Sequence, residues 1–242
     1  MIRAAIGALL AAVVATLSLP PTTYPLPPAP ESPTPAQIAR AFQGRYASLQ
    51  TLETAFLERY REGKQDVQVE SGKAWFRRPG RMRWEYEAPE KKLFLVDGKH
   101  AWFYVPADRT VTRTPVKESE DWHTPIALLA GRANLSRICG RIEFAQPPPP
   151  DTRPPAPDSR VPAYRLRCLP RNAGAPFREV LIELDANVRL LRLLIHEPGG
   201  VELEFSFAAW KENQPLPDEM FRFRVPAGVA IVEDPSLSGR AP

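Results

Sequence analysis

The segment Arg81-Met82-Arg83-Trp84-Glu85-Tyr86-Glu87 alternates strictly between charged and large apolar side chains. A period of two places Met82, Trp84 and Tyr86 on one face of a β-strand and the four charged residues on the other. The segment therefore predicts a strand with one solvated face and one apolar face. The apolar face lines either an ordinary core or the wall of an apolar cavity, and the function depends on which.

The rest of the chain reads mostly as further short strands. The strongest hairpin signal is Asp97-Gly98, which lies between two segments that are apolar on both faces and should therefore be covered on both sides. Alternating or apolar segments follow at residues 142–144, 164–168, 180–184, 190–195, 201–207 and 221–225. About nine or more antiparallel strands, each with one apolar face, predict a barrel or a sandwich.

Two helices interrupt this pattern. Thr34-Pro35 has the form of an N-cap and first helical position, and apolar residues then recur at helical spacing to residue 52. Thr124-Pro125 repeats the cap pattern before a short helix at residues 126–130, which Gly131 can close. In a barrel that is not fully closed, the place for such helices is across the open mouth.

The N-terminal segment predicts export. Residues 1–19 hold one early positive charge and an apolar run that is shorter than the about 20 residues needed to span a bilayer. They therefore resemble a secretory signal peptide, with an uncleaved anchor as the alternative.

Proline divides the remainder of the chain. Residues 20–35 are Pro-rich and predict an extended tether, and a second Pro-rich segment at residues 147–162 interrupts the body as an insert. The body reads as a single domain over residues 36–233, followed by a disordered tail at residues 234–242.

Catalytic and metal-binding patterns are not evident. The three histidines, His100, His123 and His196, lack ligand spacing, and carboxylates such as Glu202 and Glu204 fall on the solvated side of a strand. The net charge of +4 is mild, and the arginines alternate along strands, which argues against nucleic-acid binding. We therefore expect no enzyme, no cofactor and no metal.

Cys139 and Cys168 are the only two cysteines, and an oxidising compartment favours a disulfide. The alternation places Cys168 on the apolar face but Cys139 beside Arg141 and Glu143, which argues against that pairing. A bulge at Gly140 would turn Cys139 to the same face. The sequence therefore does not decide whether the two cysteines form a disulfide.

Taken in order, these segments resemble the LolA family of periplasmic lipoprotein carriers. The resemblance rests on residues 75–89, on the Leu-Val-Asp-Gly-Lys-x-x-Trp-Phe-Tyr-x-Pro hairpin at 95–106, on Thr124-Pro125 and on the ending at 221–229. It covers about residues 36–233 and implies an unclosed antiparallel β-barrel, or half-barrel, with short helices as a lid over an apolar cavity.

The resemblance also implies a function in the periplasm. Such a carrier takes an acylated lipoprotein from an inner-membrane ABC transporter of the LolCDE type and delivers it to an outer-membrane acceptor of the LolB type. We expect a monomer. Two alternatives use the same fold: a lipid-sensing or chaperone module, and a receptor of the LolB type, against which the lack of an N-terminal lipidation cysteine counts.

Ten residues from clean alternations are the candidate walls of the acyl-binding cavity: Phe76, Met82, Trp84, Tyr86, Val180, Ile182, Leu184, Leu203, Phe205 and Phe207. Arg78, before Pro79, matches the family's arginine, which hydrogen-bonds the lid backbone and holds the empty carrier closed. We expect its acceptors to be the carbonyls that end a short lid helix, such as the one near residues 126–131.

Overall fold

The computed structural model describes residues 32–116, 129, 134–145 and 162–233, and Pro33–Pro242 form one compact unit. The predicted signal peptide, most of the tether and of the Pro-rich insert, and the predicted tail lie outside the described residues. The predicted helix at residues 126–130 also lies outside them, except for Leu129.

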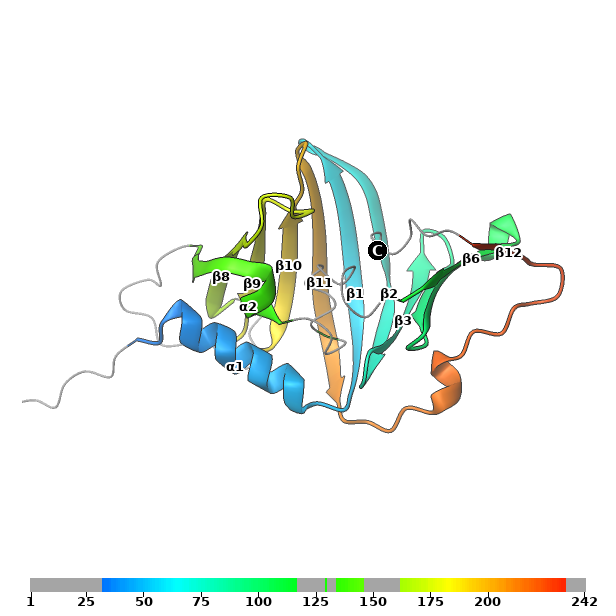
Figure 1. The fold of residues 1–242 in the computed structure, drawn as a ribbon, viewed down its shortest axis with the longest axis horizontal. Coiled ribbons are helices and arrows are strands. Elements are labelled where there is room, and N and C mark those ends of the chain that lie inside the picture. Colours follow the sequence, from blue (N-terminus) through cyan, green and yellow to red (C-terminus); the bar gives the residue numbers. More distant parts are fainter. Residues whose placement is uncertain (1–31, 117–128, 130–133, 146–161, 234–242) are drawn as a thin grey trace, which may run out of the picture. The chain divides into compact units, whose positions relative to one another are not determined.

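Twelve strands of the described ranges form one sheet, in the order β12-β6-β5-β4-β3-β2-β1-β11-β10-β9-β8-β7 (Figure 1). Their bounds are β1 Thr51–Glu62, β2 Gln65–Arg77, β3 Arg81–Ala88, β4 Lys92–Val96, β5 His100–Val105, β6 Thr110–Pro115, β7 Cys139–Phe144, β8 Tyr164–Pro170, β9 Glu179–Leu184, β10 Leu190–His196, β11 Val201–Glu212 and β12 Ala230–Glu233. Neighbouring strands are antiparallel, except that β12 pairs with β6 in parallel. The predicted unclosed sheet is confirmed.

The alternating segment at residues 81–87 lies in strand β3, and its apolar and charged side chains lie on opposite faces of the sheet, as predicted. Met82, Trp84 and Tyr86 are buried, and the register places Trp84 between Ala74 on β2 and Phe94 on β4. We call the face that carries these residues the inner face and the opposite one the outer face.

Helix α1, Pro35–Ser48, begins at the predicted cap. Thr34 and Gln37 form a capping box, in which each side chain satisfies the other's backbone N–H. Ile38, Phe42 and Tyr46 lie in the same apolar cluster as the inner face, and Figure 1 shows α1 crossing in front of the strands β8 to β11. The helix therefore covers part of that face.

The predicted helix end at residue 52 is wrong. Leu49 is already extended, and β1 begins at Thr51. From there the buried residues follow a period of two, through Leu52, Thr54 and Phe56 to Glu58. Pairing with both β2 and β11 supplies every backbone partner that the helix would otherwise provide, so the sheet prevails over the helical spacing.

The outer face of the β4–β5 hairpin is covered, as its two apolar faces predicted. Leu95, Trp102 and Val111 form a second small cluster, against which Phe223 packs. Phe223 stacks on Trp102 with ring centroids 5.2 Å apart. The predicted strand at 221–225 is therefore wrong, because this segment crosses the outer face as a cover after a 3₁₀ turn, η3, at Asp218–Phe221. A further 3₁₀ turn, η1, spans Pro106–Asp108.

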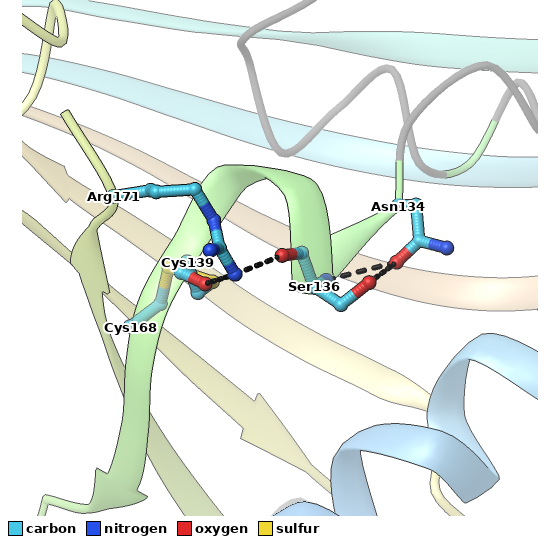
Figure 2. The surroundings of a disulfide bond; sticks show 5 residues. All are labelled: Asn134, Ser136, Cys139, Cys168 and Arg171. Carbon is cyan, nitrogen blue, oxygen red and sulfur yellow. Dashed lines mark hydrogen bonds between the residues drawn. A yellow bond between two sulfur atoms is a disulfide. The ribbon is translucent and has the colours of Figure 1, made fainter.

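A disulfide joins Cys139 to Cys168, so of the two arrangements left open the structure has the bridged one (Figure 2). The β7–β8 register shifts between Cys139 and Arg141, which is the bulge at Gly140 that turns Cys139 inward. A Cβ at Gly140 would lie 3.0 Å from the Arg171 Cα, so the close approach of the Arg171 backbone leaves no room for a side chain at this position.

A helical turn that the sequence did not predict leads into the bridged strand. Helix α2, Leu135–Ile138, is capped by Asn134, whose side chain accepts from the Ser136 N–H. The Arg171 guanidinium donates to the Ser136 carbonyl oxygen at 2.7 Å and to that of Cys139 at 3.5 Å (Figure 2). The disulfide and Arg171 thus hold α2 against β8.

Candidate functional site

The inner face is centred on Trp84, which is 0% exposed. Its ring contacts four phenylalanines edge-on, at centroid distances of 4.7 Å to Phe56, 5.7 Å to Phe76, 5.8 Å to Phe205 and 6.4 Å to Phe207. These aromatic rings come from β1, β2, β3 and β11, which are neighbours in the sheet. The result is a continuous aromatic surface on one face.

The structure brings all ten candidate wall residues to this face. Nine are buried, and Leu203, near the end of β11 that follows the β10–β11 turn, is partly buried against the same cluster. Val180, Ile182 and Leu184 extend the surface onto β9, where they pair with Ile195, Leu193 and Leu190 of β10.

Sequence reasoning missed further members of the same apolar cluster: Phe42 and Tyr46 on α1, Phe56 on β1, Leu193 on β10 and, partly buried, Trp210 on β11. The helical spacing within residues 35–48 could have identified the first two. Leu129 is also 1% exposed in this cluster, so the segment between β6 and α2 contributes at least one side chain to it.

Tyr46 anchors the end of α1 on the sheet. Its hydroxyl oxygen accepts from the Leu190 N–H at 3.0 Å, and its ring lies 6.0 Å from Trp210. Burial raises the pKa of the Tyr46 hydroxyl well above its usual value, so it stays neutral. The helix is therefore held to β10 and β11 by one hydrogen bond and by ring packing.

Arg78 contacts the end of helix α1. Its guanidinium donates to the backbone carbonyl oxygen of Tyr46, one of the carbonyls in the last turn of α1 that have no partner within the helix. The acceptors expected near residues 126–131 fall outside the described residues, except for Leu129; the contact with Tyr46 forms because the β2–β3 turn lies beside the end of α1. Partial burial lowers the pKa of Arg78.

Arg77 points to the other side of the sheet and is tied to the C-terminal cover. It donates to the Leu216 carbonyl oxygen at 3.0 Å and forms an ion pair with Asp218. Arg81 reaches the same carboxylate at 3.0 Å. The neighbouring residues Arg77 and Arg78 therefore contact different segments: Arg77 binds the C-terminal cover, and Arg78 binds the end of α1.

Four polar side chains interrupt the inner face next to Trp84, and of these only Tyr86 was predicted to lie there, as a wall residue. We call Glu58, Glu70, Tyr86 and Lys92 the polar row. The Tyr86 hydroxyl donates to Glu58 Oε2 at 2.8 Å, and Lys92 Nζ donates to Glu70 Oε1 at 2.5 Å. Burial raises the pKa of Glu58 to about 7. Charged residues at positions of β1 and β2 that face inward were the available signal.

The outer face carries a network of charges. Arg192 bridges Glu183 on β9, at 2.9 Å, and Glu204 on β11, at 3.3 Å. Glu204 is only 7% exposed, so the expectation that it is a solvated carboxylate is wrong: its neighbours bury it by ion pairing across strands.

Among the residues that the structure describes, no group of three or more His, Cys, Asp and Glu side chains is arranged to hold a metal ion. Within the same ranges, none of the helices has the length and apolarity that a membrane crossing requires.

Comparison with known proteins confirms the predicted family resemblance. The model of the family described as outer membrane lipoprotein carrier protein LolA matches residues 47–142. An outer-membrane lipoprotein carrier protein of Nitrosospira multiformis is 28% identical over 178 residues, covering 69% of this chain and 74% of the relative. One of Bordetella avium is 29% identical over 165 residues, with 68% and 72% covered.

Among solved structures, an uncharacterized conserved protein of Thermus thermophilus superposes with a TM-score of 0.51 at 12% identity. The superposition covers 82% of this chain and 98% of the other. At this identity the likeness concerns the fold alone.

Proposed function

From the LolA domain matched at residues 47–142, we propose that this chain is a periplasmic carrier of acylated lipoproteins. The inner face receives the acyl chains after release from the inner membrane, and the carrier passes them to the outer membrane. Two further proteins belong to this proposal: a LolCDE-type ABC transporter as the donor and a LolB-type acceptor. The names of the relatives from Nitrosospira and Bordetella support it.

The observation that carries this proposal is the extent of the apolar inner face. The aromatic surface around Trp84 continues through Phe205 onto the aliphatic residues of β9 and β10, and α1 covers it from one side. Each CH₂ group of an acyl chain gains about 0.8 kcal/mol on transfer into such surroundings. Several acyl chains together therefore supply ample free energy for binding. A carrier must also be able to release them, so this binding has to be reversible.

Arg78 offers a way to make the binding reversible. When α1 rests on the inner face, the Arg78 guanidinium stabilises that closed arrangement through the Tyr46 carbonyl. Acyl chains that displace α1 break this hydrogen bond and expose the apolar side of the helix that packs on the sheet. The closed, empty carrier is thereby stabilised, which offsets part of the free energy of cargo binding and promotes release.

The test measures binding and transfer separately. Wild-type protein is titrated with a tripalmitoylated lipopeptide, with tryptophan fluorescence as readout, and then mixed with acceptor liposomes that carry a LolB-type receptor. Wild type that binds no acylated peptide would overturn the carrier proposal.

Arg78→Leu tests the closing contact. It should bind at least as tightly as wild type and transfer more slowly, because its empty state is less stable. Arg59→Leu is the matched control, since Arg59 lies on the adjacent strand, is partly exposed and has a distant ion pair at 3.9 Å. Equal transfer rates for all three proteins would refute the role of Arg78.

A further inference from the structure

The indole N–H of Trp84 has no hydrogen-bond acceptor among the residues that the structure describes, although the side chain is 0% exposed. Buried donors in folded proteins are nearly always paired. The rings around Trp84 belong to phenylalanines, whose side chains offer no oxygen atom. A free donor in the middle of an apolar binding face points to a ligand that supplies the acceptor.

The polar row lies directly beside this donor. Tyr86 follows Trp84 by two residues on the same face of β3, and Glu58 follows Phe56 in the same way on β1. The Phe56 ring contacts both aromatic residues of β3, at 4.7 Å from Trp84 and 5.0 Å from Tyr86. The inner face therefore changes from apolar to polar within one step along the strands.

The polar row has one member on each of four neighbouring strands. Glu58 is paired with Glu70 in the β1–β2 register, and Tyr86 with Lys92 in the β3–β4 register. Glu58 is 8% and Glu70 is 7% exposed, so both carboxylates are buried within the inner face.

The balance of charge in the polar row disfavours an anion. Two carboxylates stand against one ammonium group, and that ammonium is engaged by Glu70. Glu58 is held by the neutral hydroxyl of Tyr86. A ligand head that carries its own carboxylate would be repelled here, whereas carbonyl and amide groups would find a donor at Trp84 and an acceptor at Glu58.

We propose that Trp84 and the polar row recognise the ester and amide linkages of an acylated ligand and discriminate against free fatty acids. The indole N–H donates to an ester carbonyl oxygen, Glu58 accepts from an amide N–H, and the chains lie on the apolar part of the inner face. This inference rests on the proposed carrier function and specifies the chemistry of its ligand.

The first test compares two ligands that differ only in their ester carbonyl groups. One is a tripalmitoylated cysteinyl peptide, and the other is its ether-linked analogue with the same chains. Trp84→Phe keeps an aromatic ring and removes the donor. It should weaken binding of the ester ligand by about two- to tenfold, as expected for one hydrogen bond, and leave the ether ligand unchanged.

Because each variant serves as its own reference, a general loss of packing cancels in the ester-to-ether ratio. An equal effect of Trp84→Phe on both ligands, or none on either, would overturn the inference while leaving the carrier function intact. Wild type that binds neither ligand would overturn the carrier function itself.

The second test addresses the charge of the polar row. At pH 8, Glu58→Gln should raise the affinity for palmitate relative to methyl palmitate by severalfold, because it removes one negative charge from the site. Glu87→Gln is the control, since that carboxylate lies on the same sheet but is exposed, with Lys73 at 3.6 Å. A ratio that stays at the wild-type value in Glu58→Gln would overturn the role of the polar row.

Discussion

Replacing Glu58 by Gln should change how the stability of this protein depends on pH. Burial raises the pKa of the Glu58 carboxyl from its usual 4.5 to about 7, against the hydrogen bond from Tyr86, which favours the ionised form. The folded protein therefore holds this proton more tightly than the unfolded chain. Between about pH 4.5 and pH 7 the unfolded chain has already lost it, so stability falls as the pH rises through this window.

The size of the effect follows from the difference between the two pKa values. At about 1.4 kcal/mol for each pH unit, the interval from 4.5 to about 7 corresponds to a loss on the order of 3 kcal/mol, complete only above pH 7. The amide introduced by Glu58→Gln cannot ionise, and its oxygen can still accept from the Tyr86 hydroxyl. The variant should therefore lose this contribution to the slope and be more stable than wild type at pH 8.

The assay is urea unfolding, followed by tryptophan fluorescence at half-unit steps between pH 4.5 and pH 8. Wild type and Glu58→Gln should have similar free energies of unfolding at the acid end and diverge towards neutral pH. Glu87→Gln, an exposed substitution on the outer face, should follow the wild-type curve. If Glu58→Gln shows the same slope as wild type, Glu58 is ionised throughout and the argument from burial fails.

Three further outcomes are expected. Trp84→Glu should weaken acyl-chain binding at least tenfold without abolishing folding, as circular dichroism and lipopeptide titration would show; unchanged affinity would place Trp84 outside the site. Deletion of residues 20–33, which spares the Thr34 cap, should leave thermal unfolding and lipopeptide binding unchanged, because the deleted segment is Pro-rich and nearly free of large apolar side chains; loss of either would refute the tether. Replacing Cys139 and Cys168 together by Ser should lower the free energy of unfolding by roughly 3 kcal/mol in denaturant titrations, since the bridge closes a loop with a sequence separation of 29; a reducing agent should reproduce this in wild type and do nothing to the variant.

The sequence alone determined those features that depend on local patterns. The alternation around Trp84 assigned both faces of β3, and Asp97-Gly98 located the β4–β5 hairpin. Thr34 and Pro35 located the start of α1. Each of these signals acts within a few residues, through the two-residue period of a strand, a tight turn or a helix cap, so no distant partner is needed to read it.

The tertiary structure decided the features in which two distant segments compete or meet. Helix α1 ends before the helical spacing of apolar residues does. The residues from 51 onward instead form β1, a central strand that pairs with β2 and β11. The alternation at 221–225 had no strand to pair with and instead covers Trp102. In both places local propensity was weaker than the burial and hydrogen bonding that distant strands supply.

The candidate site divides in the same way. Its apolar residues could be predicted, because each faces inward by the local period of its own strand. The contact of Arg78 with Tyr46 and the register of Glu58 with Glu70 exist only once the strands are side by side. The same holds for the indole N–H of Trp84, which has no acceptor in the part of the chain that the structure describes. A two-residue period states which face a side chain occupies, whereas its polar partner is set by sheet register and helix packing, which are properties of the whole fold.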